Sequence, residues 1–292
     1  MKNISSEGFS VVTEDGVTLK GELLYPQGNP RGVVQINAAT GATRRYYVPF
    51  AQYLTEHGFI VCLWDYRGMG ESASKALSEL DYSFSEIGLK DMPAILDFLK
   101  SKFSTIPILG IGHSVGGQQL GLIKNNQILK GFVAVATSAG FPAFMPLGYR
   151  LKTLYFFYVF SPISIKLKGY VAAKKFGIME DLPKNVLLEW RDWCSKPDYL
   201  FAKEFYGKTI PKGNYKNLSF PIQVLAATDD PIANPTSVKR FWSHIASDRG
   251  VSIRTYTPAE LGVAKIDHFG FFRKSFKQSI WKDIISSLEN FL

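Results

Sequence analysis

Cysteine and histidine are scarce in this chain, and both shortages narrow the chemistry that it can perform. The sequence has only two cysteines, Cys62 and Cys194, and only four histidines among its 292 residues. Two cysteines supply neither a disulfide framework nor the ligand spacing of a zinc site. We therefore expect a protein of a reducing compartment, the cytoplasm, with no bound metal.

Uncharged runs long enough to cross a membrane are missing as well. Lys, Arg, Asp and Glu are absent from residues 103–123, 131–149 and 153–165. Glycines and prolines interrupt the first two stretches, and the third has only 13 residues, whereas a spanning helix needs about 20. The polar segment Met1–Ser10 also lacks the apolar core of a secretory signal. We expect neither a transmembrane helix nor a secretory signal.

Positive charge is concentrated in one part of the chain. The net charge is +9, and residues 141–216 hold 13 Lys and Arg against 6 Asp and Glu, which leaves +2 for all other residues. A basic region is compatible with nucleic acid, an anionic membrane surface, acidic substrates or a solvated face. No nucleic-acid-binding module accompanies it, so we expect no nucleic-acid partner. Peripheral membrane contact and steering of anionic substrates stay open.

Short apolar runs alternate with helical patterns along most of the sequence. The runs are continuously apolar, which is typical of parallel strands covered on both faces. An alternating hairpin at 9–23 precedes them. We predict an α/β protein with a mostly parallel sheet of about eight strands flanked by helices. The later strands are predicted at 32–36, 59–64, 106–111, 132–136, 222–227 and 251–256, and the helices at 47–57, 86–102, 235–247, 274–292 and from Ser114 onward.

Residues 139–218 differ in composition from the rest of the chain. They are basic, carry helical patterning and contain no repeat of the strand–helix rhythm. We predict that they form a mostly helical lid inserted into one core, which consists of residues 1–138 and 219–292. The aromatic residues of this segment include Tyr155, Phe156, Phe157, Tyr158, Phe160, Trp190 and Trp193.

A candidate nucleophile lies between a predicted strand and a predicted helix. Gly112–Gly116 reads GHSVG and follows the apolar run 106–111 directly. In this setting G-x-S-x-G forms a sharp corner that exposes the serine hydroxyl, and glycines are needed because side chains would collide there. A purely structural turn is the alternative. We predict that Ser114 is the nucleophile.

The same glycines also fit a dinucleotide-binding turn. That fingerprint requires an acidic residue at the end of the following strand, about 20 residues on, to bind the ribose. The next predicted strand instead continues into Thr137 and Ser138, and the corner follows the third parallel-type strand rather than the first. We therefore expect no nucleotide cofactor.

His268 is the candidate general base among the four histidines. His57 has a helix-capping role, His113 lies inside the turn, and His244 lies within a predicted helix. His268 follows the last predicted strand in a loop at the carboxyl end of the sheet, where ligand sites of such sheets lie. A structural histidine is the alternative.

Two adjacent aspartates are candidates for the carboxylate that orients the histidine. Asp229 and Asp230 directly follow the predicted strand 222–227, at the same end of the sheet. We expect one of them to cap the turn and the other to hold the imidazole in a single tautomer. The order Ser114, Asp, His268 is the chain order expected for a nucleophile elbow of this type.

These features together resemble the α/β-hydrolase superfamily, and within it a bacterial group of predicted hydrolases related to serine aminopeptidases and monoglyceride lipases. The resemblance covers nearly the whole core and includes GHSVGG at Gly112–Gly117 and DYRGMGES at Asp65–Ser72. It implies the α/β-hydrolase fold, and it favours Asp230 as the triad acid because that residue precedes Pro231-Ile232.

The resemblance also implies an oxyanion hole built from two backbone N–H groups. Many relatives have His-Gly after the third strand, whereas this chain has NAATG at Asn37–Gly41. Because the hole needs only a backbone N–H there and that of Val115, Ala39 can serve without the histidine. Ala38 is the neighbouring alternative.

We therefore predict a serine hydrolase that cleaves an ester, thioester or lipid-like acyl substrate through an acyl-enzyme, with no organic cofactor. Transfer of the acyl group to an alcohol is compatible with the same residues. The first alternative is an aminopeptidase-like amide hydrolase, which the basic lid disfavours because a substrate ammonium requires carboxylates. The second is a non-catalytic binding protein on a hydrolase scaffold.

Overall fold

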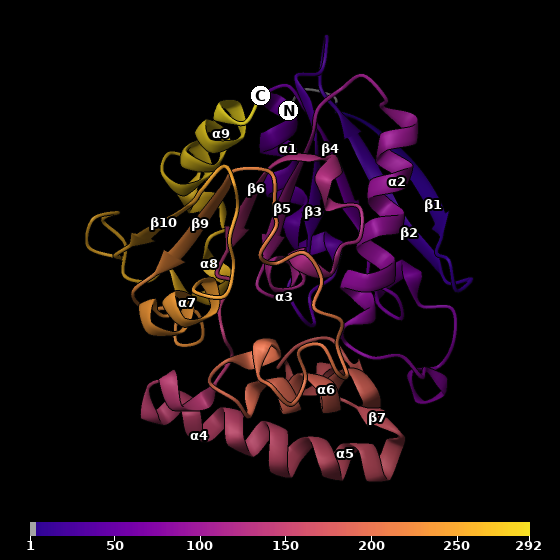
Figure 1. The fold of residues 1–292 in the computed structure, drawn as a ribbon, viewed down its shortest axis with the longest axis vertical. Helices are drawn as coiled ribbons and strands as arrows, with labels where there is room; N and C mark the ends of the chain where they lie inside the picture. Colours follow the sequence, from indigo (N-terminus) through magenta and orange to yellow (C-terminus); the bar gives the residue numbers. More distant parts are fainter. Residues whose placement is uncertain (1–3) are drawn as a thin grey trace.

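One mixed sheet forms the centre of the molecule (Figure 1). The computed structural model describes residues 4–292, so the expectation about a secretory signal falls partly on residues outside it. The strand order is β1-β2-β4-β3-β5-β6-β9-β10. All strands run in the same direction except β2, which is antiparallel to β1 and to β4. The predicted sheet of eight mostly parallel strands is confirmed. Its strands are β1 Ser5–Val12, β2 Thr18–Tyr25, β3 Gly32–Asn37, β4 Phe59–Trp64, β5 Ile108–His113, β6 Leu129–Val135, β9 Ile222–Ala227 and β10 Val251–Tyr256.

Helices cover both faces of this sheet because successive crossovers run in opposite directions. Helix α1 connects β3 to β4, and α2 then carries the chain from β4 back past β3 to β5. Right-handed crossovers place two such helices on opposite faces. Every residue of β3, β4 and β5 is buried, which explains why these strands are continuously apolar in the sequence.

The predicted helices are present, but several have different bounds. The helix after β9 ends at Trp242 and continues only as single turns, and the last helix begins at Ile280 because the backbone breaks at Ser279. Asn234 caps α7 by accepting from the N–H groups of Thr236 and Ser237, both at 3.1 Å. The helices are α1 Val48–Glu56, α2 Met92–Lys102, α3 Val115–Gln118, α4 Leu147–Tyr155, α5 Ser161–Lys168, α6 Lys184–Cys194, α7 Pro235–Trp242, α8 Asp267–Gly270 and α9 Ile280–Asn290.

The chain between β6 and β9 leaves the sheet and forms a separate layer. We call residues 139–218 the inserted segment. Figure 1 shows α4, α5 and α6 beyond the end of the sheet at which α3 and α8 lie. A π-helical turn at Phe156–Phe160 joins α4 to α5, so that helix is continuous from Leu147 to Lys168. The short strands β7 (Tyr170–Val171) and β8 (Leu182–Pro183) pair beside it.

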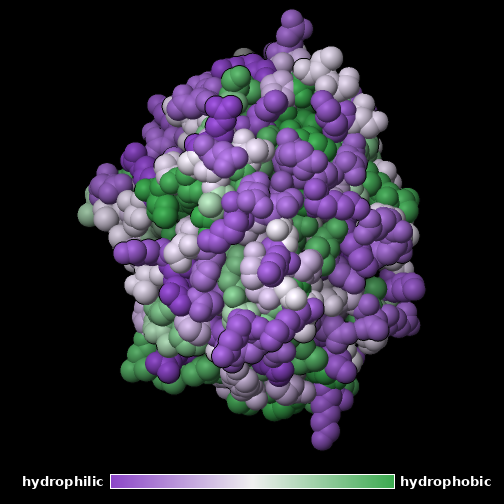
Figure 2. All heavy atoms as spheres, in the orientation of Figure 1, coloured by the Kyte–Doolittle hydropathy of each residue, from purple (hydrophilic) through white to green (hydrophobic). Residues whose placement is uncertain are grey.

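Several large apolar side chains of the inserted segment are exposed to solvent. Figure 2 shows green, hydrophobic side chains at the end of the molecule formed by this layer. Spacings of three or four residues place several of these side chains along one side of the continuous helix. The large exposed apolar residues of this helix are Leu147, Leu151, Tyr155, Tyr158, Val159, Ile163 and Leu167.

Candidate active site

Ser114 sits at a strained corner between β5 and α3. Its backbone has φ 53° and ψ −113°, which is rare for a residue with a side chain. The corner is held by the Ser114 N–H, which donates to the carbonyl of Val135 at 2.9 Å. A Cβ atom on Gly112 would lie 2.4 Å from the Gly116 carbonyl oxygen, and one on Gly116 would lie 2.3 Å from that of Asn37. Only glycine fits at either position.

His268 and Asp230 form a buried pair at the carboxyl end of the sheet. Asp230 follows β9 and His268 lies in α8, and their Oδ2 and Nδ1 atoms are 2.8 Å apart. Asp230 is 1% exposed and His268 6%. The other carboxylate oxygen of Asp230 accepts from the N–H groups of Ile232 and Ala233, both at 2.8 Å. The carboxylate is therefore fixed and faces the imidazole.

The neighbouring carboxylate, Asp229, has a different partner. Its Oδ2 accepts from the N–H groups of Ile266 and Asp267, at 2.8 and 3.1 Å. These amides belong to the turn that leads into α8. Asp229 therefore holds the loop that carries His268, whereas Asp230 contacts the imidazole itself.

The N–H of Ala39 does not have the partner that the sequence suggested. It donates to the hydroxyl of Tyr47 at 2.9 Å, inside the core, so it is already engaged rather than free for an oxyanion. No sequence pattern indicates this bond, because Tyr47 lies in the short turn Arg44–Tyr47 that precedes α1. Thr40 lines the cavity described below, and within residues 4–292 no hydrogen-bond partner takes up its N–H.

Tyr47 belongs to a buried hydrogen-bonded chain that joins three loops. Because its hydroxyl accepts from Ala39, it donates to Nδ1 of His113, 2.7 Å away. The Nε2–H of His113 then donates to the backbone carbonyl of His268 at 3.0 Å. Burial, followed by the charge of His268, lowers the pKa of His113 well below its usual value. His113 is therefore a neutral structural link between the elbow and the His268 loop.

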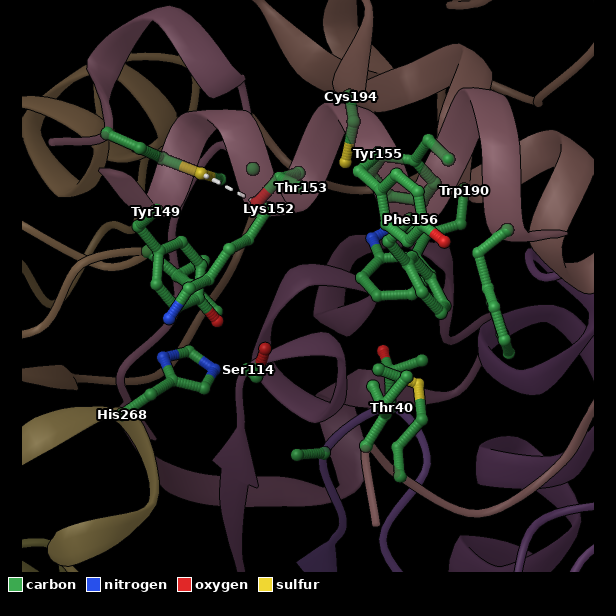
Figure 3. A pocket seen from close by; sticks show the side chains of 18 of the residues that line it. Thr40, Ser114, Tyr149, Lys152, Thr153, Tyr155, Phe156, Trp190, Cys194 and His268 are labelled. Atoms are coloured by element: carbon green, nitrogen blue, oxygen red, sulfur yellow. Dashed lines mark hydrogen bonds between the residues drawn. The ribbon is translucent and has the colours of Figure 1, made fainter. Parts of the chain in front are cut away.

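A cavity of about 620 Å³ opens above the elbow. Ser114 and His268 lie side by side at its floor, and α4 and α6 supply its upper walls (Figure 3). No Ser114–His268 hydrogen bond forms in the described chain, which is common in the unliganded state of such pairs. Most of the wall is apolar, including Met145, Leu151, Phe156, Phe157, Phe160, Ile178, Met179, Trp190 and Phe269.

One family model and one curated relative match parts of the chain. A family model described as "Serine aminopeptidase, S33" matches residues 28–172, about half of the chain. Human lipase member N is 31% identical over 129 residues, which span 38% of this chain and 32% of that lipase. The chain thus aligns with about a third of this curated relative.

Solved structures resemble the chain over almost its whole length. A carboxyl esterase from Bacillus coagulans superposes with a TM-score of 0.65 at 16% identity, covering 99% of both chains. An esterase from Pyrococcus furiosus superposes with a TM-score of 0.62 at 14% identity, covering 98% of this chain and 91% of that one. The chain belongs to the α/β-hydrolase superfamily. Its fold is that of the esterases with which it superposes.

Two properties of this α/β hydrolase concern ligands and membranes. Among residues 4–292, no group of three or more His, Cys, Asp and Glu side chains is arranged to hold a metal ion. Over the same residues, no helix has both the length and the apolar character to span a membrane.

Sequence reasoning missed two polar side chains of the hydrolase cavity. Tyr149 and Lys152 extend from α4 toward His268 (Figure 3). Burial and the charges of Asp230 and Asp267 raise the pKa of Tyr149 to about 12, so its hydroxyl keeps its proton. Their i, i+3 spacing places both on one side of α4, but no sequence pattern indicates that this side faces the elbow.

Proposed function

We propose that Ser114, His268 and Asp230 form the catalytic triad of a serine hydrolase that cleaves an ester, thioester or lipid-like acyl substrate. One observation carries the proposal. The buried Asp230–His268 hydrogen bond of 2.8 Å lies at the floor of the cavity into which the strained Ser114 corner opens. A carboxylate in this position fixes the imidazole tautomer, with Nε2 left to accept a proton from the serine.

The proposed reaction has two halves. The Ser114 oxygen bonds to the acyl carbon while its proton passes to Nε2 of His268, and His268 then gives that proton to the departing alcohol or thiol. A water molecule next attacks the acyl-serine ester and loses a proton to His268, which passes that proton to the departing Ser114 oxygen as the carboxylic acid is released. An alcohol in place of that water would give acyl transfer.

We assign the oxyanion hole to Val115 and Thr40. Val115 opens α3, and no partner in residues 4–292 takes up its N–H. Thr40 replaces Ala39 in this role because the Ala39 N–H is engaged by Tyr47. Two backbone donors directed at the developing oxyanion are the usual arrangement for acyl transfer.

The inserted segment acts, in this proposal, as a lid over the core formed by residues 1–138 and 219–292. Its aromatic side chains from α4, the π-helical turn and α6 line the cavity opposite Ser114. Such a wall suits an apolar acyl chain, because burial of apolar surface supplies most of the affinity in pockets of this kind.

Amide hydrolysis is the second candidate, because the matching family model is described as a serine aminopeptidase. An aminopeptidase binds the free ammonium of its substrate, and carboxylates are the natural partners. No Asp or Glu side chain lines the described cavity. Faster cleavage of amino-acyl amides than of neutral esters would make this candidate the leading one.

A fluorophosphonate probe and a panel of nitrophenyl esters of increasing acyl length test the proposal. The probe should attach to Ser114, and Ser114→Ala should abolish labelling and lower turnover about a million-fold. Ser138→Ala is the control, because that hydroxyl bonds only the Ile232 carbonyl. Mass-spectrometric mapping to another serine, or an absence of both labelling and turnover, would contradict the assignment.

A further inference from the structure

The cavity wall carries almost no charge. Of the side chains that line it, Lys152 is the one with a permanent charge, and His268 is the other that can become positive. The wall contains hydroxyls, thioethers and aromatic rings but no carboxylate. A single permanent positive charge in an apolar cavity favours ligands with a negative charge.

Lys152 has no charged partner among the residues that the structure describes. The sequence contains no Asp or Glu from residue 98 to residue 179, so neither its own helix nor α5 offers a carboxylate. Within residues 4–292 its ammonium makes no ion pair and no hydrogen bond. Two other lysines of the inserted segment are paired at 2.8 Å, Lys174 with Glu180 and Lys196 with Glu204.

The ammonium lies on one particular side of the cavity. Figure 3 shows Lys152 and Tyr149 extending from α4 toward His268, whereas Phe156 and Trp190 occupy the opposite side. His268 must protonate the leaving alcohol or thiol, so the leaving group occupies the His268 side in the proposed mechanism. The acyl chain then occupies the aromatic side.

We infer that this hydrolase is selective for acyl substrates whose leaving alcohol or thiol carries an anionic group, a carboxylate or a phosphate, and that Lys152 binds this group. The inference rests on the proposed function of the triad. Tyr149 has a hydroxyl next to the same position, which offers a second donor to the anion. The matching substrate is amphiphilic, with an apolar acyl chain and a negatively charged head.

The expected preference is moderate because Lys152 is exposed to solvent. A charge-assisted hydrogen bond is stronger than a neutral one, but solvent and salt screen an exposed pair. We expect about a tenfold preference in kcat/KM for an anionic over a neutral leaving group of equal size.

Three octanoyl phenyl esters measure this preference without changing the reactive bond. Their leaving phenols carry a carboxymethyl, a phosphonomethyl or a neutral carbamoylmethyl group in the para position. The methylene insulates the phenol oxygen, so the three leaving groups have nearly equal acidity. The ratio of kcat/KM for each anionic ester to that for the amide ester isolates the contribution of charge, and the two anionic esters distinguish carboxylate from phosphate recognition.

Variants at Lys152 decide whether this side chain is responsible. Lys152→Met should reduce the ratio from about ten to about one, Lys152→Glu should bring it below one, and Lys152→Arg should keep it above one. Lys166→Met is the matched control, because it removes the same charge from α5 at an exposed position that does not line the cavity. Its ratio should stay near that of the unchanged protein.

The outcomes separate this inference from the proposal on which it rests. Hydrolysis of all three esters at equal rates by the unchanged protein would overturn the role of Lys152 and leave the triad standing. A high ratio that survives Lys152→Met, or one that falls equally in Lys166→Met, would also overturn it. A protein that hydrolyses none of the esters and resists the fluorophosphonate would overturn the proposed function and this inference together.

Discussion

The central sheet and the inserted segment differ in how much of their apolar surface is buried. Every residue of β3, β4 and β5 is buried. Among residues 4–292, nine of the thirteen large apolar residues that are exposed lie between Leu147 and Ile178, inside the inserted segment. In the proposed mechanism the sheet therefore positions Ser114, Asp230 and His268, and the inserted segment supplies most of the apolar wall and, among residues 4–292, the one cavity-lining cation without a partner.

The largest expected difference is in turnover, between variants of two adjacent residues of the core. Asp230→Asn removes the carboxylate that fixes the His268 tautomer, and the corresponding change in a well-studied triad lowers turnover about ten thousand-fold. Asp229→Asn replaces a carboxylate that only accepts from two backbone amides of the His268 loop. We expect it to retain most of the activity and to lose about 1–2 kcal/mol of stability. Turnover of a nitrophenyl ester and urea denaturation measure both effects, and the reverse order of rates would move the triad acid to Asp229.

Truncation of one leucine in each region tests the contrast in stability. Leu109 in β5 is 0% exposed, and Leu167 in α5 is 77% exposed. Leu109→Ala leaves a cavity in a packed core and should lower the free energy of unfolding by about 2–5 kcal/mol. Leu167→Ala should change it by less than about 0.5 kcal/mol. A large loss for Leu167→Ala would mean that the outer side of the segment is covered in solution.

The smallest expected effect concerns the buried chain from Ala39 to His268. Tyr47→Phe leaves the Ala39 N–H and Nδ1 of His113 without partners, which should cost about 1–3 kcal/mol of stability. Turnover of all esters should fall alike, because the three linked loops lose their common contact. Tyr53→Phe in α1 is the control, because this tyrosine is also buried and its hydroxyl makes no hydrogen bond within residues 4–292. Equal stability of the two variants would show that the chain contributes little.

The sequence predicts well those features of the site that follow from the order and direction of the strands. Ser114, Asp230 and His268 each follow a parallel strand, and because parallel strands end at one edge, these three residues had to approach one another. Strand order does not distinguish Asp229 from Asp230, since both follow the same strand, and only the family resemblance favours Asp230. The structure distinguishes them by their partners, which are two backbone amides for Asp229 and the imidazole for Asp230.

Features that depend on the orientation of side chains cannot be predicted from the sequence. Sequence patterns do not determine the register of the Asn37–Gly41 loop. The bond between Ala39 and Tyr47 joins two segments whose contact no periodicity encodes. The sequence shows that Lys152 belongs to a basic region, but it does not show that α4 directs this side chain into the cavity. Packing between the inserted segment and the core decides that direction.

The position of the inserted segment between β6 and β9 also affects how the protein is made. Ser114 is synthesised before the segment, and Asp230 and His268 after it. A ribosome that adds 5–20 residues per second needs about 8–30 s to proceed from the serine to the histidine. During that interval the nascent chain has a nucleophile without its base. Under the proposed mechanism, unfinished or prematurely terminated chains are inert toward acyl compounds, and activity appears only when translation has passed His268.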